Sequence, residues 1–185
     1  MSADRCPRCL IPRTCLCARI PTIQSRIHFI FIRHATEGAR TSNTARMAHL
    51  ALSGSELYDH GDPRGPVPIA DLLTPDTWRL DSSGEPWDPS QTLPRQLLVL
   101  DGSWPQVRRM LRRLPVLHGM RRFALPPPPP RVRMRLPPPE GMSTLEAVAT
   151  TLRLLEGDDS AADALLVLYD EMTKLVLAGS GKQRR

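Results

Sequence analysis

The sequence of 185 residues is poor in aromatic side chains, which make up 4% of it, and it contains only two lysines. No apolar run approaches the roughly 20 residues that a membrane-spanning helix needs. Neither Gly-x-Gly-x-x-Gly nor Gly-x-x-x-x-Gly-Lys occurs, so the phosphate-binding loops of dinucleotide and nucleoside-triphosphate enzymes are not expected. The first residues, Met-Ser-Ala-Asp-Arg-Cys, do not resemble a secretory signal, and we therefore expect a cytoplasmic protein.

The sequence does have enough apolar residues for a hydrophobic core, since these make up 41% of it. Its length predicts one domain with a small appendage. We divide it into a cysteine-containing knuckle at 1–22, a main domain at 23–178 and a flexible tail at 179–185. No obligate protein partner is evident.

Positive charge is concentrated in one part of the chain. The net charge is +6, and the segment from Arg95 to Arg135 contains ten arginines and one acidic residue, Asp101. A local basic face is the electrostatic footprint of nucleic-acid binding, although a solvated face or a biased base composition of the gene would also produce arginines. The candidate RNA-binding residues are Arg108, Arg109, Arg112, Arg113, Arg131 and Arg133.

The four cysteines lie within the first 17 residues, as Cys6-x-x-Cys9 and Cys15-x-Cys17. Disulfides are rare in cytosolic proteins, whereas four thiolates this close in sequence suit one tetrahedral zinc ion. Unligated or redox-active cysteines are the alternative. A four-thiolate site has no open coordination position, so the expected zinc is structural and not catalytic.

Hydrophobic periodicity predicts strands that alternate with helices, which is typical of an α/β domain with a mostly parallel sheet. The predicted strands are Arg26–Ile32, a segment near Val67–Leu73, Leu97–Leu100 and Arg131–Leu136, the last with one apolar and one arginine face. The predicted helices are Ala45–Leu52, one after Ser103, one after Ser143 and one from about Ala162 to Leu177.

The most informative segment is Leu100-Asp101-Gly102-Ser103-Trp104, at the end of a predicted strand and the start of a helix. Ligands of parallel sheets bind where strands end and helices begin. A simpler interpretation is a helix start alone, because Ser103 and Gln106 form a capping box, but this leaves Asp101 and Trp104 unexplained. Two further polar helix starts are Asn43-Thr44 and Ser143-Thr144.

Four segments, taken in their order along the chain, resemble the DTW-domain family of tRNA-uridine aminocarboxypropyltransferases. The resemblance covers nearly the whole chain. The segments are the cysteine segment 6–17, His34-x-x-Glu37 with the segment 42–46, Leu100–Trp104, and the segment 140–147. Two departures stand out: Ser103 replaces a usual threonine and keeps the hydroxyl, and Val132 stands where a tyrosine is usual.

The resemblance implies a SPOUT-like knotted domain that binds S-adenosylmethionine. It also implies the reaction, in which the 3-amino-3-carboxypropyl group of S-adenosylmethionine moves to N3 of a uridine in the variable loop of tRNA and methylthioadenosine leaves. Asp101, Ser103 and Trp104 are the candidate catalytic residues. The candidate S-adenosylmethionine-binding residues are Asn43, Thr44, Arg46, Leu100, Gly102, Ser143, Thr144 and Glu146, and His34 and Glu37 are further possible site residues.

The expected reaction suggests roles for several of these residues, and the sequence leaves an alternative role open for most of them. Asp101 is the first candidate for the base that removes the uridine proton, and its alternative role is to bind the turn or the amine of the donor. Trp104 would stack on a base or pack in the core, and Arg46 would bind the carboxylate of the donor. Glu146 would anchor the site or only complete a capping box.

Two other functions compete with this one. The same fold could transfer the methyl group of S-adenosylmethionine to RNA, or the chain could be a non-enzymatic zinc-knuckle module that binds RNA. An RNA-binding module would need neither Asp101 nor the Ser143-Thr144 turn. These residues therefore distinguish it from an enzyme.

Overall fold

A computed structural model describes residues 5–63, 65–134 and 141–179 of the chain. A five-stranded, all-parallel sheet forms the middle layer, in the order β2-β1-β4-β3-β5. The strands are β1 (His28–His34), β2 (Glu56–His60), β3 (Thr77–Pro86), β4 (Gln96–Asp101) and β5 (Arg121–Ala124). The predicted α/β class is therefore confirmed; its expected knot stays a prediction.

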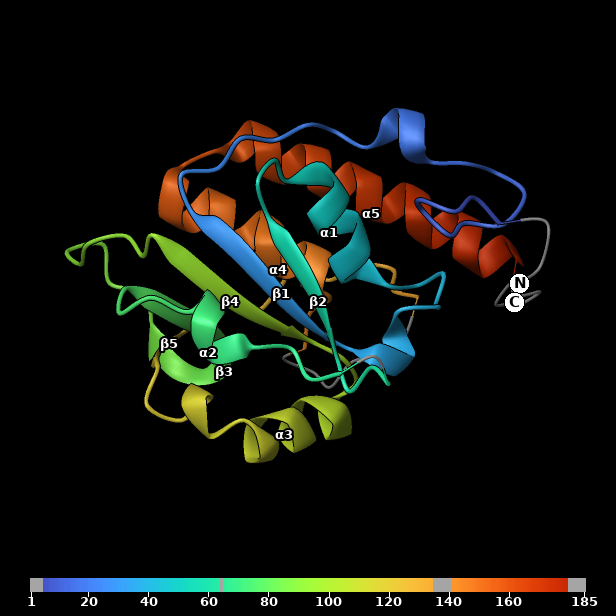
Figure 1. Cartoon of the computed structure of the whole chain (residues 1–185). Coiled ribbons are helices and arrows are strands. Elements are labelled where there is room, and N and C mark those ends of the chain that lie inside the picture. The colour runs from blue at the N-terminus through green and yellow to red at the C-terminus, as the bar shows by residue number, and fades with distance from the viewer. Residues whose placement is uncertain (1–4, 64, 135–140, 180–185) are drawn as a thin grey trace.

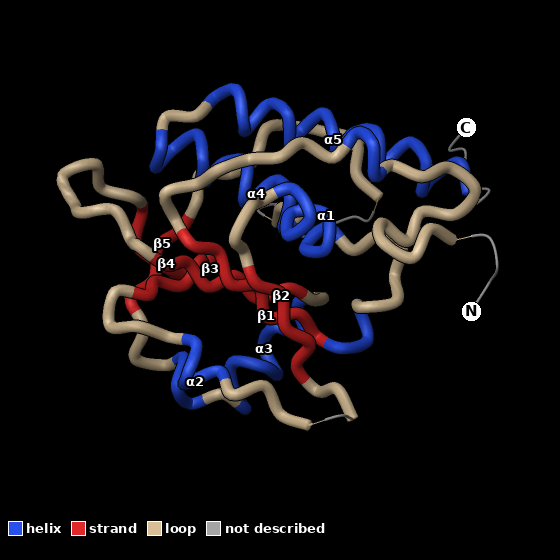
Figure 2. Tube along the Cα trace, turned by 45° about the horizontal axis from the view of Figure 1, so that its top comes forward, coloured by secondary structure: helices blue, strands red, loops and turns tan. Residues whose placement is uncertain are grey.

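Helices cover both faces of the sheet (Figures 1 and 2). On one face lie α1 (Thr44–Ala51), α4 (Thr144–Thr151) and α5 (Asp159–Gly179), with α4 joined to α5 through a π-helical turn at Leu152–Glu156. On the other face lie α2 (Ile69–Leu72) and α3 (Trp104–Arg113). None of the helices in the described parts of the chain is long and apolar enough to cross a membrane.

Alternation along the central strands separates two hydrophobic cores. Phe29 and Phe31 of β1 belong to the larger core, under α1, α4 and α5, whereas Ile30 and Ile32 belong to the smaller core, on the α3 side. Successive strand side chains point to opposite faces of a sheet, and both faces of a parallel sheet are covered. The nearly continuous apolar run in β1 follows from this arrangement.

The strand order reverses between β1 and β4. These two strands are neighbours, but the chain leaves β1 toward α1 on one face and leaves β4 toward α3 on the other (Figure 2). Such a reversal opens a crevice at the carboxyl ends of the two strands, which is where open parallel sheets bind ligands. The topology thus points to the residues that follow β1 and β4.

Several predicted elements are confirmed with small shifts at their ends. The first strand begins and ends two residues later than expected, so Arg33 and His34 belong to β1. The predicted core residues of α4 and the following turn, among them Leu145 and Val148, are buried, and α5 buries Leu165, Leu168 and Met172.

Other expectations were wrong. Val67–Leu73 contains a short helix, because Pro68 lacks a backbone donor for a strand ladder and instead precedes α2. The part of Arg131–Leu136 that the structure describes, 131–134, forms no strand; residues 135 and 136 lie outside the described residues, as does the predicted tail beyond Gly179. The strands β2, β3 and β5 were not predicted, since their short or polar stretches carry no clear alternation.

Candidate functional site

Two adjoining cavities lie around the carboxyl end of β4, the smaller beside the loop that follows β1 and the larger beside β3 and α3. The larger has a volume of about 630 Å³ and a mainly apolar lining that includes Leu80, Val99, Leu100, Val107 and Met142. The smaller has a volume of about 290 Å³, and many of its lining residues are polar, among them Glu37, Asn43, Asp101, Ser143 and Thr144. Both are lined by Gly102, Trp104, Met142 and Thr144, so the two cavities meet beside the Leu100–Trp104 segment.

Asp101 ends β4 and lies at the bottom of the smaller cavity, with 7% of its surface exposed. The Thr144 hydroxyl donates to its Oδ1 at 2.5 Å, and the Asn43 side-chain amide donates to its Oδ2 at 2.7 Å. A carboxylate has about four lone-pair positions, so each oxygen can accept one more hydrogen bond. The three polar segments named from the sequence therefore meet at this carboxyl group.

Burial raises the pKa of Asp101 above the ordinary value of 3.8. The hydrogen bonds from Thr144 and Asn43 and the charge of Arg33 oppose this rise, while the charge of Glu37 adds to it. A carboxyl group with a raised pKa is a stronger base than an exposed one once it is ionised. The environment of Asp101 suits a group that accepts a proton.

Gly102 permits the close approach of the elements around Asp101. A Cβ atom at this position would lie 3.2 Å from the Gln106 side chain on α3 and 3.4 Å from the Cβ of His34 at the end of β1. The first contact is tighter than ordinary van der Waals packing and the second is at its short limit, so a larger residue would require the Gln106 side chain to shift. Gly102 is needed for packing as well as for lining the cavities.

The helix α4 begins at the cavity with the predicted capping box. The Ser143 hydroxyl accepts from the Glu146 N–H, and Glu146 Oε2 accepts from the Ser143 N–H at 2.8 Å. Glu146 is buried and also pairs with Arg133, whose Nη2 lies 3.2 Å from its Oε1. Glu146 thus completes the capping box and holds Arg133 against the wall of the cavity.

Trp104 is not a core residue, because 40% of its surface is exposed. It is the first residue of α3 and contributes to the walls of both cavities. An exposed indole ring beside a cavity offers a flat apolar face to a base. Its position excludes the core-packing alternative.

Most of the predicted S-adenosylmethionine-binding residues lie around the cavities. Asn43, Thr44, Gly102, Ser143, Thr144 and Glu146 line the smaller one, and Leu100 lines the larger one. Arg46 lines neither; its Nη2 donates to the Gly38 carbonyl at 2.7 Å. Arg46 supports the loop after β1.

The predicted RNA-binding arginines fall into two groups. Arg108, Arg109, Arg112 and Arg113 are exposed on α3, and within the described parts of the chain none of them forms an ion pair. Arg108 also lines the larger cavity. Arg131 and Arg133 instead pair with Asp170 of α5 and Glu146 of α4. The second pair of arginines therefore stabilises the folded chain.

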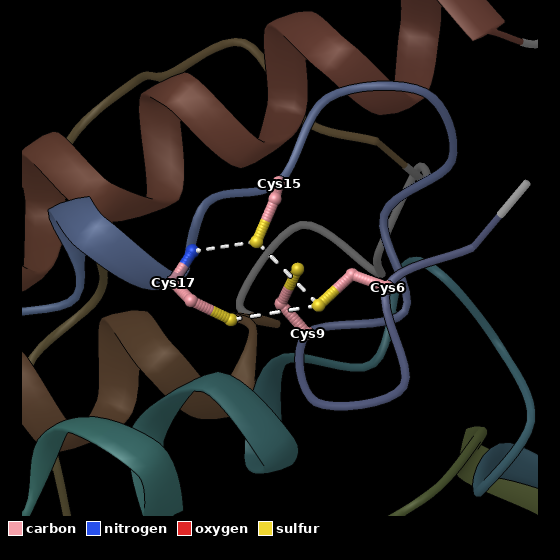
Figure 3. A group of neighbouring side chains, drawn as sticks. All are labelled: Cys6, Cys9, Cys15 and Cys17. Carbon is pink, nitrogen blue, oxygen red and sulfur yellow. Dashed lines mark hydrogen bonds between the residues drawn. The ribbon is translucent and has the colours of Figure 1, made fainter.

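The four cysteines gather into one cluster with their sulfur atoms facing one another (Figure 3). All four sulfurs lie within 4.8 Å of one another, and Cys6 Sγ lies 3.5 Å from Cys15 Sγ and 3.6 Å from Cys17 Sγ. Ligands 2.3 Å from a tetrahedral zinc ion are about 3.8 Å apart, so the cluster has the size of such a site. A disulfide needs sulfurs about 2 Å apart, and all four cysteines are free.

The electrostatics of the cluster also favour a cation. Backbone N–H groups of Cys9 and Arg8 lower the pKa of Cys6 to about 6, whereas burial raises the pKa of Cys17 to about 12. The thiols share protons because neighbouring thiolates repel one another, and a divalent cation among them would remove this repulsion. The four cysteines are positioned to bind a metal ion.

Some residues of the cleft carried no signal in the sequence. Arg79 and Asp81 of β3 line the larger cavity and pair at 2.7 Å, and Tyr169 of α5 lines the smaller one. β3 lies two strands away from β1 in the sheet, and α5 is distant in sequence. Only a correct prediction of the strand order would have brought them to the site.

The fold defines a parallel α/β protein with a candidate ligand site where the strand order reverses. Over residues 3–177 the chain matches the DTW domain family, and it belongs to that family. The DTW family is the tRNA-uridine aminocarboxypropyltransferase family, and this membership gives the chain a tRNA-modifying role with tRNA as its substrate. No solved structure matches the chain significantly.

Proposed function

We propose that the protein transfers the 3-amino-3-carboxypropyl group of S-adenosylmethionine to N3 of a tRNA uridine. The observation that supports this most is the meeting of two cavities, the smaller one lined by many polar residues, beside a buried carboxylate, Asp101. The donor would occupy both cavities, with its adenosine part in one and its amino-acid arm in the other, and the uracil would lie where they meet.

The larger cavity suits the adenosine and thioether parts of the donor. Its apolar walls would cover the adenine ring, and the Asp81 carboxylate at its polar side would accept hydrogen bonds from the ribose hydroxyls. The smaller cavity suits the amino-acid arm, because the N-terminal ends of α1 and α4 and the hydroxyls of Ser143 and Thr144 surround this cavity. Helix N-termini of this kind favour a carboxylate.

The sulfonium of the bound donor makes Cγ of the amino-acid arm electrophilic. N3 of the uridine would bond to Cγ while the Cγ–S bond breaks, and the electron pair of that bond stays on sulfur. Asp101 would accept the N3 proton, since a neutral uridine nitrogen is a poor nucleophile. Trp104 would stack on the uracil or the adenine where the cavities meet, and Ser103 would contribute its hydroxyl at the same place. Positioning of Cγ over N3 then decides that the arm, and not the methyl group, is transferred.

The α3 helix would hold the tRNA backbone. Its four exposed arginines, Arg108, Arg109, Arg112 and Arg113, follow directly after Trp104, so a phosphate bound there lies near a base in the cleft. Phosphate contacts position a nucleic acid without reading its sequence. The metal at Cys6, Cys9, Cys15 and Cys17 would be a structural zinc ion.

The test is an incubation of the purified protein with unmodified tRNA and S-adenosylmethionine, followed by mass spectrometry of the nucleosides and the spent donor. Aminocarboxypropyl-uridine together with methylthioadenosine is the expected result. Methylated nucleoside with S-adenosylhomocysteine would replace the proposal by methyl transfer. Binding of tRNA with neither product would favour a non-enzymatic RNA-binding module.

A further inference from the structure

Three charged residues form one row across the carboxyl ends of β2, β1 and β4. Asp59 is the register partner of Arg33 on one side, and Asp101 is its register partner on the other. Register partners point to the same face of a sheet, here the face that carries α1 and α4. The row therefore runs from the sheet edge directly to the candidate base.

Arg33 is held tightly within this row. Its Nε and Nη2 donate to the two carboxylate oxygens of Asp59 at 2.6 and 2.9 Å, and only 4% of Arg33 is exposed. A planar guanidinium bound in this bidentate way has its remaining donors in fixed directions. One of them, Nη1, donates to Oδ1 of Asn43 at 3.2 Å.

The side-chain amide of Asn43 consequently has one possible orientation. Its Oδ1 accepts from Arg33 Nη1 and, at 2.8 Å, from the backbone N–H of Arg46 at the start of α1. A flipped amide would place its NH2 group against both donors and its oxygen against the Asp101 carboxylate. The orientation found directs Nδ2 to Asp101 Oδ2 at 2.7 Å.

We propose that Arg33, locked by Asp59, is a positioning residue that fixes Asn43 as a hydrogen-bond donor to Asp101 and keeps that carboxylate ionised for the reaction. The proposal rests on the proposed function, in which Asp101 accepts the uridine proton. In this orientation Asn43 stabilises the ionised form of Asp101 more than the protonated form, because a charged carboxylate oxygen is a stronger acceptor than the oxygen of a neutral acid. Arg33 adds the field of a cation in the neighbouring strand.

Other charged groups also face Asp101. Glu37 lies on the loop after β1 and pairs with Arg40, and its charge opposes ionisation of Asp101. Arg46 is on α1, and Glu146 on α4 forms an ion pair with Arg133. The substitutions chosen below leave all of these groups in place.

The experiment compares the wild-type chain with an Arg33→Met/Asp59→Leu double variant. Replacing both partners by apolar groups avoids an unpaired buried charge. The matched control, Arg131→Met/Asp170→Leu, removes an ion pair on the α5 side that does not contact Asp101. Two quantities are measured against pH: the carboxyl 13C shift of Asp101, identified by its absence in Asp101→Asn, and the single-turnover rate of aminocarboxypropyl transfer.

The expected result is a rise of about one pH unit or more in the titration midpoint of Asp101 in the Arg33/Asp59 variant, and none in the control. The acidic limb of the rate profile should rise by the same amount. A folded variant with an unchanged Asp101 midpoint would overturn the proposal. A shifted midpoint with an unmoved rate profile would uphold the positioning role and overturn Asp101 as the base.

A measurement on the wild-type chain tests the same contact if the double variant does not fold. The Nδ2 protons of Asn43 should shift with the titration midpoint of Asp101 and remain two separate, slowly exchanging signals. Asn43 amide signals that do not respond to this titration would overturn the proposal.

Discussion

Two regions of the molecule use their charged residues differently: the cleft at the carboxyl end of β4, and the exposed side of α3. In the cleft, Arg33, Asp101, Arg133 and Glu146 are largely buried, and each has a charged or hydrogen-bonding partner. On α3, four arginines are exposed, and none has an ion-pair partner within the described parts of the chain. Buried charges require partners, whereas an exposed cation remains available to a polyanion. The difference separates charges that build the candidate site from charges that we propose bind the tRNA.

The largest effect is expected in the cleft, from Asp101→Asn. The variant keeps the size of the side chain but cannot accept the proton, so the single-turnover transfer rate should fall by about 10²- to 10⁴-fold. Binding of tRNA, measured by filter retention, should stay near the wild-type value. A rate within threefold of wild type would remove Asp101 from the chemistry and weaken the contrast between the two regions.

The raised pKa of Asp101 also predicts how the stability of Asp101→Asn, compared with wild type, depends on pH. The pKa of Asp101 is raised in the folded chain, so the stability that this carboxyl contributes is present below its ordinary pKa and is lost as the pH rises through the folded value. Asp101→Asn cannot ionise. The Tm of the variant relative to wild type should therefore increase as the pH rises above about 4, and a constant difference would contradict the raised pKa.

Metal removal should destabilise a part of the chain outside both regions. Cys9 is buried among the residues of the larger core, as are Ile11 and Leu16. Cys9→Ser should lower the metal content and reduce the free energy of unfolding by several kcal/mol, because metal binding at a four-cysteine site is coupled to folding. Zinc measured by atomic emission should be near one per chain in wild type; unchanged metal in Cys9→Ser would refute the site.

Within the cleft, Arg133→Met should reduce the free energy of unfolding by about 3 kcal/mol, since it leaves Glu146 buried without its cation. The matched variant Arg131→Met removes the partner of Asp170, whose side chain is half exposed, and should cost less than about 1 kcal/mol. Urea denaturation compares the two. Equal losses would show that burial does not distinguish these arginines.

On α3, Arg109→Ala and Arg112→Ala should have the smallest effect on stability and a specific effect on tRNA. Each should reduce the salt dependence of tRNA binding by about one unit of slope, and the pair should weaken binding roughly tenfold. The affinity for S-adenosylmethionine, measured by calorimetry, should not change. An equal loss of donor affinity would place these arginines in the cleft instead of on an RNA-binding face.

Local patterns predicted the parts of the site that depend on a few neighbouring residues. The capping boxes that begin α3 and α4, the strand that ends at Asp101 and the clustered cysteines all follow from spacings shorter than six residues. Arg131 and Arg133 show the limit of this reasoning. Their alternation with Val132 and Met134 has the period of a strand, but the partners that decide their conformation, Asp170 and Glu146, come from two other helices.

The sequence by itself determined the strands β1 and β4, the polar turns that follow them and the helix starts at Ser103 and Ser143, because these depend on local hydrogen bonding and on hydrophobic periodicity. Only the tertiary structure decided the strand order β2-β1-β4-β3-β5, which places Arg33 between Asp59 and Asp101 and brings Asn43 and Thr144 to one carboxylate. Contacts between residues 26 to 68 positions apart depend on how whole strands pair, and pairing is set by packing of the two cores and not by any local signal.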